Sequence, residues 1–368
     1  MIYRVIGLMS GSSLDGLDIV FAEFEAKGNS WNYDIKYAEC VAYSDEWVKQ
    51  LQQAGELNAY DYLLLHAAYG KFTAGLVNDF IQKNSLYHQV QLIGSHGHTV
   101  FHSPQSGMTS QLGDGAAIAA VTGINVVSDL RAMDVALGGQ GAPIVPVGEK
   151  LLFPQYAFCL NIGGIANLSF RHNDAYIAFD ICPANRVLNM LANELGKAYD
   201  DDGVFAAGGK LNTALLTQLN ALPYYRQPFP KSLANNFGVE EVYPIIQSYA
   251  IPVEDALRTY SEHITQQMVY AINGLMTSFP AGAVMGGQML ITGGGAFNGF
   301  LIAAIKTALK PLNIEVVVPD EKIIRYKEAL IMALLAVLRW REEDTVMSSV
   351  TGATRNSIGG AVWMGLEA

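Results

Sequence analysis

Three glycine-rich turns lie far apart in this chain, and each follows or interrupts an apolar, β-branched run. They are GLMSGSSLDGLD at 7–18, NIGGIANLS at 161–169 and ITGGGAFN at 291–298. Each pattern predicts a strand that bends sharply, where backbone N–H groups can approach a phosphate closely. One such turn would mean little, but three at these separations predict a nucleotide held between two similar half-proteins.

The length and composition favour two compact α/β domains. At 368 residues the chain exceeds the size at which a single hydrophobic core usually stops growing, so domains of roughly 150 to 200 residues are expected. Hydrophobic residues make up 51% and charged residues 15% of the chain, and 36 glycines supply the turns that alternating strands and helices require.

The charge and the apolar segments exclude several functional classes. Lys and Arg number 23 against 34 Asp and Glu, and the net charge of −11 argues against wide contact with nucleic acid. The first 18 residues do not resemble a signal peptide, and the apolar run at 329–338 is far shorter than the ~20 residues of a membrane span. Cys40, Cys159 and Cys182 match neither a disulfide framework nor a CxxC metal site. We therefore expect a cytoplasmic protein with no nucleic-acid or membrane partner.

Hydrophobic periodicity predicts the same arrangement of strands and helices twice. The first half has predicted strands at 3–8, 18–24 and 92–94 and helices at 45–55 and 60–83. The second half has predicted strands at 157–160, 166–170, 175–179, 289–292 and 315–318 and helices at 186–195, 211–219 and 255–278. The segment 354–363 is expected to return to the first half. This predicts a first domain of residues 1–130 with 345–368 and a second of residues 131–344.

Nine short motifs together resemble one known family. They are, in order, GLMSGSSLDGLD, GSHGHTVFH, SDLR, GGQGAPIVP, NIGGIANLS, FDICPAN, DDDGVFAAGG, PKS and ITGGGAFN. This order resembles that of the anhydro-N-acetylmuramic acid kinases, and the match covers nearly the whole chain. The resemblance implies an α/β fold of two actin-like (ribonuclease H-like) domains with an active-site cleft between them, as in the actin, hexokinase and Hsp70 class.

The resemblance also implies a reaction. Family members use ATP and Mg²⁺ to act on 1,6-anhydro-N-acetylmuramic acid, an amino sugar released in peptidoglycan recycling. Water opens the anhydro bridge at C1 and the released O6 takes the γ-phosphate, which gives N-acetylmuramic acid 6-phosphate and ADP. Relatives are commonly dimers, so a homodimer is expected. Two alternatives stay open: an ordinary sugar hydroxyl kinase of the same fold, and an ATP-binding protein with impaired catalysis.

The turn at 11–18 resembles the first phosphate loop of the family. The residues expected to bind ATP there are Gly11, Ser12, Ser13, Leu14, Asp15, Gly16, Leu17 and Asp18. Asp15 is also expected to hold Mg²⁺, directly or through water. The alternative is a plain hairpin with a two-residue type I′ turn at Asp15 and Gly16. The remaining predicted nucleotide-binding residues are Gly163, Gly164, Gly203, Gly293, Gly294 and Gly295.

Asp180 is the predicted catalytic residue. It follows the apolar run AYIAF, so it is expected at the carboxyl end of a strand, where α/β proteins place their ligands. By the resemblance it is the base that takes a proton from the attacking water, and a carboxylate with a reference pKa of ~3.9 is ionised at neutral pH. The alternative is an N-cap for the helix that begins near Asn185.

Four residues are expected at the sugar: His96, Thr99, Arg131 and Glu328. His96, with His98 and His102, also permits a metal site, because residues 96 and 98 would share one face of a strand. Arg131 suits a carboxylate or sugar oxygen, and its alternative is a surface ion pair with Asp134. Glu328 matches a family glutamate near the sugar, and alone it would be an ordinary first-turn acid.

Several positions depart from the family pattern. The family has DTGPGN or DCGPGN where this chain has DICPAN, and KSTG where it has KSLA. The sequence does not decide how four of the departing residues affect activity: Ile181, Cys182, Leu233 and Ala234. We expect fewer backbone options where a glycine is absent, and slower turnover as a result.

Overall fold

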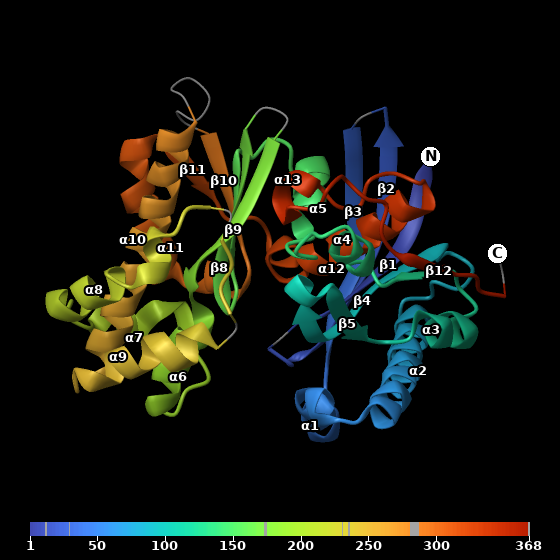
Figure 1. Cartoon of the computed structure of the whole chain (residues 1–368), viewed down its shortest axis with the longest axis horizontal. Coiled ribbons are helices and arrows are strands. Elements are labelled where there is room, and N and C mark those ends of the chain that lie inside the picture. The colour runs from blue at the N-terminus through green and yellow to red at the C-terminus, as the bar shows by residue number, and fades with distance from the viewer. Residues whose placement is uncertain are drawn as a thin grey trace. The chain divides into compact units, whose positions relative to one another are not determined.

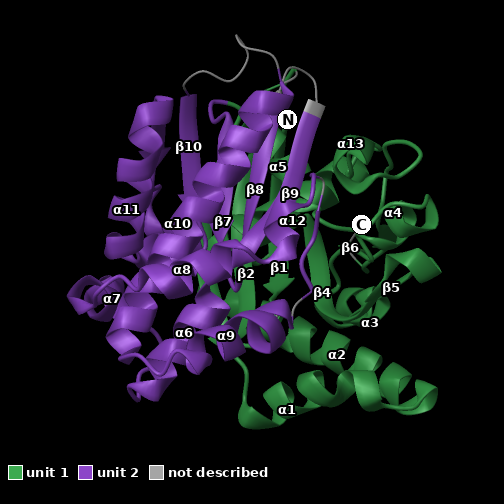
Figure 2. Cartoon of the chain, turned by 60° about the vertical axis from the view of Figure 1, so that its left-hand side comes forward, with its two compact units in different colours: residues 1–154, 326–368 green, residues 155–325 purple. Residues whose placement is uncertain are grey.

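The computed structural model describes residues 1–11, 13–28, 30–172, 175–229, 231–234, 236–279 and 287–366. The chain divides into two compact units (Figures 1 and 2): residues 1–154 with 326–368, and residues 155–325. The boundaries expected from the sequence, near residues 130 and 345, differ from this division. Among the described residues, no helix has both the length and the apolar character needed to cross a membrane.

The first unit is built on a seven-stranded mixed sheet. Its strands are β1 (Ile2–Ser10), β2 (Gly16–Lys27), β3 (Ser30–Ala42), β4 (Leu92–Ser103), β5 (Met108–Leu112), β6 (Val126–Ser128) and β12 (Ala361–Trp363). The order is β12-β6-β4-β1-β2-β3, with β5 paired to β4. Strands β1, β2 and β3 form an antiparallel meander, and β4 and β6 continue the sheet parallel to β1.

The second unit repeats this strand order. Its strands are β7 (Phe158–Ile162), β8 (Ile165–His172), β9 (Ala175–Pro183), β10 (Gly287–Thr292) and β11 (Ile314–Val317), in the order β11-β10-β7-β8-β9. Here β7, β8 and β9 form the meander, and β10 and β11 run parallel to β7. Because two halves of one chain share this five-strand topology, the expected α/β fold with two actin-like units is confirmed.

Helices complete each unit. Those of the first are α1 (Asp45–Gln53), α2 (Ala59–Lys83), α3 (Gly115–Thr122), α4 (Ala132–Ala136), α5 (Val145–Leu152), most of α12 (Glu321–Trp340) and α13 (Ser348–Thr351). Those of the second are α6 (Asn185–Glu194), α7 (Val204–Gly208), α8 (Thr213–Asn220), α9 (Tyr243–Ser248), α10 (Val253–Ser278) and α11 (Gly299–Leu309).

Helix α12 lies directly on the first sheet at two glycines. Gly7 on β1 and Gly94 on β4 are paired in register, and a Cβ on either would overlap a helix carbonyl, that of Ala329 or Met332 respectively. Residues 329–338 are buried throughout. The apolar run at 329–338 is therefore the core helix of the first unit, as its length predicted.

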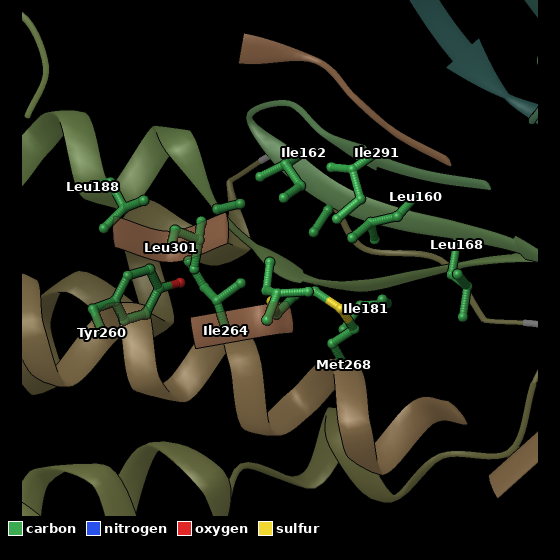
Figure 3. Packing of buried hydrophobic residues seen from close by; sticks show 14 of the residues in the cluster. Leu160, Ile162, Leu168, Ile181, Leu188, Tyr260, Ile264, Met268, Ile291 and Leu301 are labelled. Atoms are coloured by element: carbon green, nitrogen blue, oxygen red, sulfur yellow. The ribbon is translucent and has the colours of Figure 1, made fainter. Parts of the chain in front are cut away.

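The core of the second unit lies between its sheet and α10. One face of the sheet contributes Leu160, Ile162 and Leu168, which are fully buried. Tyr260, Ile264 and Met268 of α10 pack against the same cluster (Figure 3). Side chains that alternate with these residues along the strands point to the opposite face of the sheet.

The two ends of the first sheet differ in how well the sequence predicted them. The return of the C-terminal segment is confirmed, because β12 pairs antiparallel with β6. Strand β3 was not predicted. It pairs with β2 along its whole length and is an edge strand whose outer residues are mostly exposed or half-buried. Because many of its residues are polar and exposed, β3 lacks the apolar run that is typical of an interior strand.

A buried ion pair ties α5 to α12 within the first unit. The Lys327 Nζ lies 2.6 Å from Glu149 Oε1, and the two side chains are only 2% and 3% exposed. Glu149 follows residue 130 and Lys327 precedes residue 345, so both fall outside the first domain expected from the sequence. Their pairing is one physical reason that α5 and most of α12 belong to the first unit.

Replacing Lys327 with methionine is expected to lower the free energy of unfolding by about 3–5 kcal/mol, because Glu149 would be left buried and uncompensated. Urea unfolding followed by circular dichroism measures this change. The double variant Lys327→Met with Glu149→Leu should recover most of the loss.

The matched control is Lys27→Met, which breaks an exposed pair with Glu25 whose side chains are 63% and 35% exposed. A change of less than about 1 kcal/mol is expected there. Equal losses for the Lys327 and Lys27 variants would contradict the importance of the buried pair.

Candidate active site

The first glycine-rich turn links β1 and β2 through a loop, not through a tight hairpin. The last paired residues are Ser10 and Leu17, and Gly16 already pairs with Ala42 of β3. The two-residue turn at Asp15 and Gly16 is therefore wrong. Within the loop, Leu14 has a positive φ of 60° and its N–H donates to the Gly11 carbonyl at 3.3 Å.

This loop offers backbone donors. The N–H groups of Ser13 and Asp15 donate no hydrogen bond to any other described residue, and both residues are exposed. Ser12 lies outside the described residues. Leu17 is buried and Asp18 half-buried on β2, so these two predicted residues belong to the strand rather than to the loop.

A buried chain of hydrogen bonds lies under the loop. His98 Nδ1 is 3.0 Å from the Ser10 hydroxyl, which accepts from the Tyr43 hydroxyl at 2.7 Å. The Tyr43 hydroxyl in turn is 2.6 Å from that of Tyr69. Burial lowers the pKa of His98 to about 4, so its imidazole is neutral near pH 7. These hydrogen bonds fix the end of β1, where the loop begins.

His96 and Arg131 form a second polar pair in the first unit. Arg131 Nε donates to His96 Nε2 at 2.9 Å and its Nη1 donates to the Gly141 carbonyl. Because His96 Nε2 accepts, its proton is on Nδ1, which donates to the Gly97 carbonyl at 2.9 Å. Burial and the Arg131 charge lower the pKa of His96 to about 3.

The alternatives considered for these residues are not supported. Asp134 is fully buried, and its carboxylate accepts from the Gly141 N–H and the Thr351 hydroxyl, both at 2.7 Å. A surface ion pair between Arg131 and Asp134 is therefore wrong. The three histidines have separate partners, since His102 bonds Thr109. In the described part of the chain, no three His, Cys, Asp or Glu residues are placed to hold a metal ion.

Glu328 lies near Arg131, and its carboxylate accepts no hydrogen bond from another described residue. It is half-buried, and burial raises its pKa while the charges of Lys327 and Arg131 oppose the rise. The first-turn interpretation of Glu328 is wrong, because α12 begins seven residues earlier at Glu321. Thr99 is exposed on β4, and its hydroxyl accepts from Gln111 at the long distance of 3.5 Å.

Asp180 lies on β9 with one carboxylate oxygen held and the other open. Oδ2 accepts from the Leu233 N–H at 2.9 Å and from the Ser232 hydroxyl at 3.1 Å. Oδ1 accepts no hydrogen bond from another described residue. Burial raises the pKa of this carboxyl, and the two hydrogen bonds oppose the rise. A half-buried carboxylate of this kind is a stronger base than a solvated one yet can remain ionised at neutral pH.

The strand position of Asp180 differs from the one expected. Strand β9 continues past it to Pro183, with a register shift opposite Ala166 and Asn167. The N-cap alternative is wrong, because the residue that precedes α6 is Ala184 and none of the described side chains caps the helix.

The second and third glycine turns lie side by side at one edge of the second sheet. Strands β7 and β10 are adjacent and parallel, with Asn161 paired to Thr292, so the turns that follow them meet. A Cβ on Gly293 would lie 2.6 Å from Asn161 Oδ1, and one on Gly295 would overlap Ile162. These two glycines are required by close contact.

Asn185 connects the second glycine turn to α6. Its side-chain amide donates to the Ile162 carbonyl, its backbone N–H donates to the Gly163 carbonyl, and the Ala184 N–H donates to that of Gly164. The N–H groups of Gly163 and Gly164 donate to no other described residue. The turn thus has fixed carbonyls and two available donors.

Gly203 and Gly294 complete the set predicted for the nucleotide. Gly203 has a φ of 72°, and a Cβ there would overlap Asn298, the residue that caps α11. Gly294 lies against the Asn185 side chain: a Cβ on Gly294 would be 3.4 Å from Asn185 Nδ2. The second unit therefore brings Gly163, Gly203 and the 293–295 turn to the start of α6 and α11.

These features fit an anion with a bound divalent cation. Available N–H groups and glycines that exclude side chains suit the phosphates and sugar of a nucleotide. Asp15 is exposed on its loop, and one carboxylate together with phosphate oxygens is a usual binding mode for Mg²⁺.

Comparison with known proteins decides the family. A family model described as anhydro-N-acetylmuramic acid kinase matches residues 3–365. The chain belongs to the anhydro-N-acetylmuramic acid kinase family. The resemblance that the motifs predicted is confirmed: the chain is a member of a family of kinases that act on anhydro-N-acetylmuramic acid.

Curated relatives with that name support the assignment. One from Haemophilus influenzae is 34% identical and aligns over 95% of this chain and 94% of its own. One from Hydrogenovibrio crunogenus is 33% identical, with 97% of each chain covered. A solved structure titled "Activator of the 2-Hydroxyisocaproyl-CoA Dehydratase from Clostridium difficile with bound ADPNP" is 15% identical, with a TM-score of 0.46 and coverage of 92% and 96%.

Two residues of the site were not predicted from the sequence. Asn161 and Asn167, in NIGGIAN, lie on the same sheet row as Asp180. Both asparagines stand in a motif that the sequence analysis singled out. That they lie in line with Asp180, however, depends on the register between strands.

The stability of the first unit is expected to fall as the pH drops below about 6.5. Above that pH the buried His96 and His98 are neutral in both states, and their full contribution is present. Below pH 6.5 both histidines become protonated in the unfolded chain. In the folded chain they stay neutral until the pH approaches their lowered pKa values, about 3 for His96 and about 4 for His98. Each histidine then removes about 2 kcal/mol between pH 6.5 and pH 5. Urea unfolding across this range measures the slope.

The variant His98→Gln isolates one of these contributions. Glutamine does not titrate and can still bond the Ser10 hydroxyl, so the variant should lose stability less steeply between pH 6.5 and pH 5. A slope equal to that of the wild type would contradict the burial of a neutral His98.

Proposed function

We propose that this protein is an ATP-dependent anhydro-N-acetylmuramic acid kinase in which Asp180 is the catalytic base. The geometry of Asp180 carries the proposal: Oδ2 is fixed by Ser232 and Leu233, and Oδ1 is left for a proton. The site of action would be the cytoplasm, where ATP is available, and a homodimer remains a prediction from the family.

The reaction can be written with its atoms balanced. Asp180 takes one proton from water, the water oxygen bonds to C1, and the C1–O6 bond of the anhydro bridge breaks. O6 keeps that electron pair and bonds to the γ-phosphorus of ATP, while the bond from phosphorus to the β,γ-bridging oxygen breaks. The products are N-acetylmuramic acid 6-phosphate and ADP.

Backbone N–H groups would bind the phosphates of the nucleotide. In the second unit, the N–H groups of Gly163 and Gly164 would donate to phosphate oxygens, and the turn at 293–295 with Gly203 would leave room for the adenosine. In the first unit, the N–H groups of residues 13 and 15 would donate in the same way. Gly11 and Leu14 lie in the same loop, whereas Gly16, Leu17 and Asp18 begin β2. Ser12, which lies outside the described residues, stays a prediction from the motif.

Asp15 would hold Mg²⁺ together with phosphate oxygens. The chemistry that a bound Mg²⁺ supplies is neutralisation of charge on the transferring phosphoryl group. Asp15 itself contributes one exposed carboxylate on a loop whose start is fixed by Ser10.

The sugar would contact Arg131, Glu328, His96 and Thr99 of the first unit. Arg131 is oriented by His96 and by the Gly141 carbonyl, which leaves its Nη2 for a carboxylate or sugar oxygen. The Glu328 carboxylate accepts no hydrogen bond from another described residue, so it is available to accept from a sugar hydroxyl.

The variant Asp180→Asn should bind ATP as the wild type does and lose about 10²- to 10⁴-fold in kcat, because the amide cannot take the proton. Isothermal titration measures ATP binding, and ADP release in the presence of the anhydro sugar measures turnover. Wild-type turnover in this variant would contradict the role of Asp180.

Solvent oxygen should appear in the product. In water enriched in ¹⁸O, the phosphorylated sugar is expected to carry one label, at C1, because water and not a substrate hydroxyl attacks there. Mass spectrometry of the product measures the label. An unlabelled product, or equal activity with N-acetylglucosamine or glycerol, would instead favour the ordinary hydroxyl kinase.

A further inference from the structure

A row of polar side chains crosses the sheet of the second unit. Thr292 on β10 pairs with Asn161 on β7, Asn161 pairs with Asn167 on β8, and Asn167 pairs with Asp180 on β9. Residues that lie opposite each other on neighbouring strands point to the same face of a sheet. The four side chains therefore form one line that ends at the proposed base.

This line lies on the face of the sheet that points away from the helix-covered core. Asn167 alternates with Ala166 and Leu168, which are fully buried in the core cluster, and Asn161 alternates with Leu160 and Ile162 of the same cluster (Figure 3). Asn161, Asn167 and Asp180 are each half-buried. The row is thus shielded on one side yet accessible to a small molecule.

Asn167 is the member of the row with an available amide next to Asp180. Cross-strand neighbours of this kind have Cβ atoms about 4.5–5.5 Å apart. The Asn167 amide makes no hydrogen bond with another described residue, whereas Asn161 Oδ1 accepts from the Thr292 hydroxyl at 3.4 Å. Two carbonyl-type oxygens, Asp180 Oδ1 and Asn167 Oδ1, are therefore open on adjacent strands.

We propose that Asn167 and Asp180 together hold the attacking water, an inference that rests on the proposed function of Asp180. One hydrogen of the water is donated to Asp180 Oδ1 and the other to Asn167 Oδ1. With both hydrogens held, a lone pair of the water oxygen is directed at C1 of the anhydro sugar. The proton passes to Asp180 as the oxygen–C1 bond forms and the C1–O6 bond breaks.

The charged and titratable groups around Asp180 allow a clean test. Among the described residues of the second unit these groups are Tyr224, Cys182 and Lys231. Burial raises the pKa of Tyr224 and of the Cys182 thiol, so both are neutral between pH 5 and pH 8. The Lys231 ammonium donates to the carbonyls of Tyr224 and Tyr225. Glu328 of the first unit, whose pKa burial raises, can also contribute to the acidic limb of a pH–rate profile. A shift of that limb when residue 167 gains a charge would therefore be the signal that reports Asp180.

The experiment uses the full chain with Asn167→Ala and Asn167→Asp, and the matched controls Asn193→Ala and Asn193→Asp. Asn193 is exposed on α6. For each variant, sugar-dependent ADP release gives kcat and kcat/KM from pH 5 to pH 8, and titration with ATP gives the nucleotide affinity.

We expect Asn167→Ala to lower kcat about 10- to 100-fold with unchanged ATP affinity, because the water loses one of its two acceptors. Asn167→Asp retains an acceptor but places a like charge beside Asp180, which raises the pKa of Asp180. Its acidic limb should move to higher pH by about one unit. Both Asn193 variants should match the wild type.

Wild-type kcat in Asn167→Ala, or an unshifted limb in Asn167→Asp, would overturn the inference. A lower kcat with an unshifted limb would mean that Asn167 only supports the strand. These results differ from failure of the proposed function, in which the wild type itself shows no sugar-dependent turnover or Asp180→Asn remains active.

Discussion

The structure depends on backbone contacts that only glycine permits. At Gly7 and Gly94 the carbonyl groups of α12 touch the first sheet, and any side chain at either position would separate helix from sheet. Glu328 immediately precedes Ala329, the residue that contacts Gly7. The same close approach that builds the core of the first unit therefore fixes where the Glu328 carboxylate lies relative to Arg131.

The second unit uses the same constraint at its glycine turns. Gly293 and Gly295 lie against Asn161 and Ile162, so the ends of β7 and β10 form one surface rather than two independent loops. Ala184 and Asn185 then fix three carbonyls of that surface by donating hydrogen bonds to Ile162, Gly163 and Gly164. What remains available is a small number of N–H donors, which is the condition for binding an anion without a large positive charge. This is consistent with a chain whose net charge is −11.

The sequence predicted the parts of the fold that have an apolar period, and its motifs supplied the residues of the proposed site. It did not predict β3, whose polar residues face outward at an edge, or that β9 runs past Asp180. The row that joins Asn167 to Asp180 could not be predicted, because register between strands is set by turn geometry and core packing rather than by spacing along the chain. The first-turn interpretation of Glu328 was wrong for a different reason: α12 starts at Glu321, directly after Asp320, whose carboxylate accepts from the Ile323 N–H.

The departures from the family pattern are accommodated where the structure places them. Ile181 and Cys182 are buried in the core of the second unit, and none of Ile181, Cys182 and Ala184 has a positive φ. Leu233 contacts Asp180 through its backbone N–H, which any residue except proline supplies, while its side chain is buried. The substitutions therefore leave the hydrogen bonds of the Asp180 carboxylate intact. This argues for a working base rather than for an ATP-binding protein that has lost its chemistry.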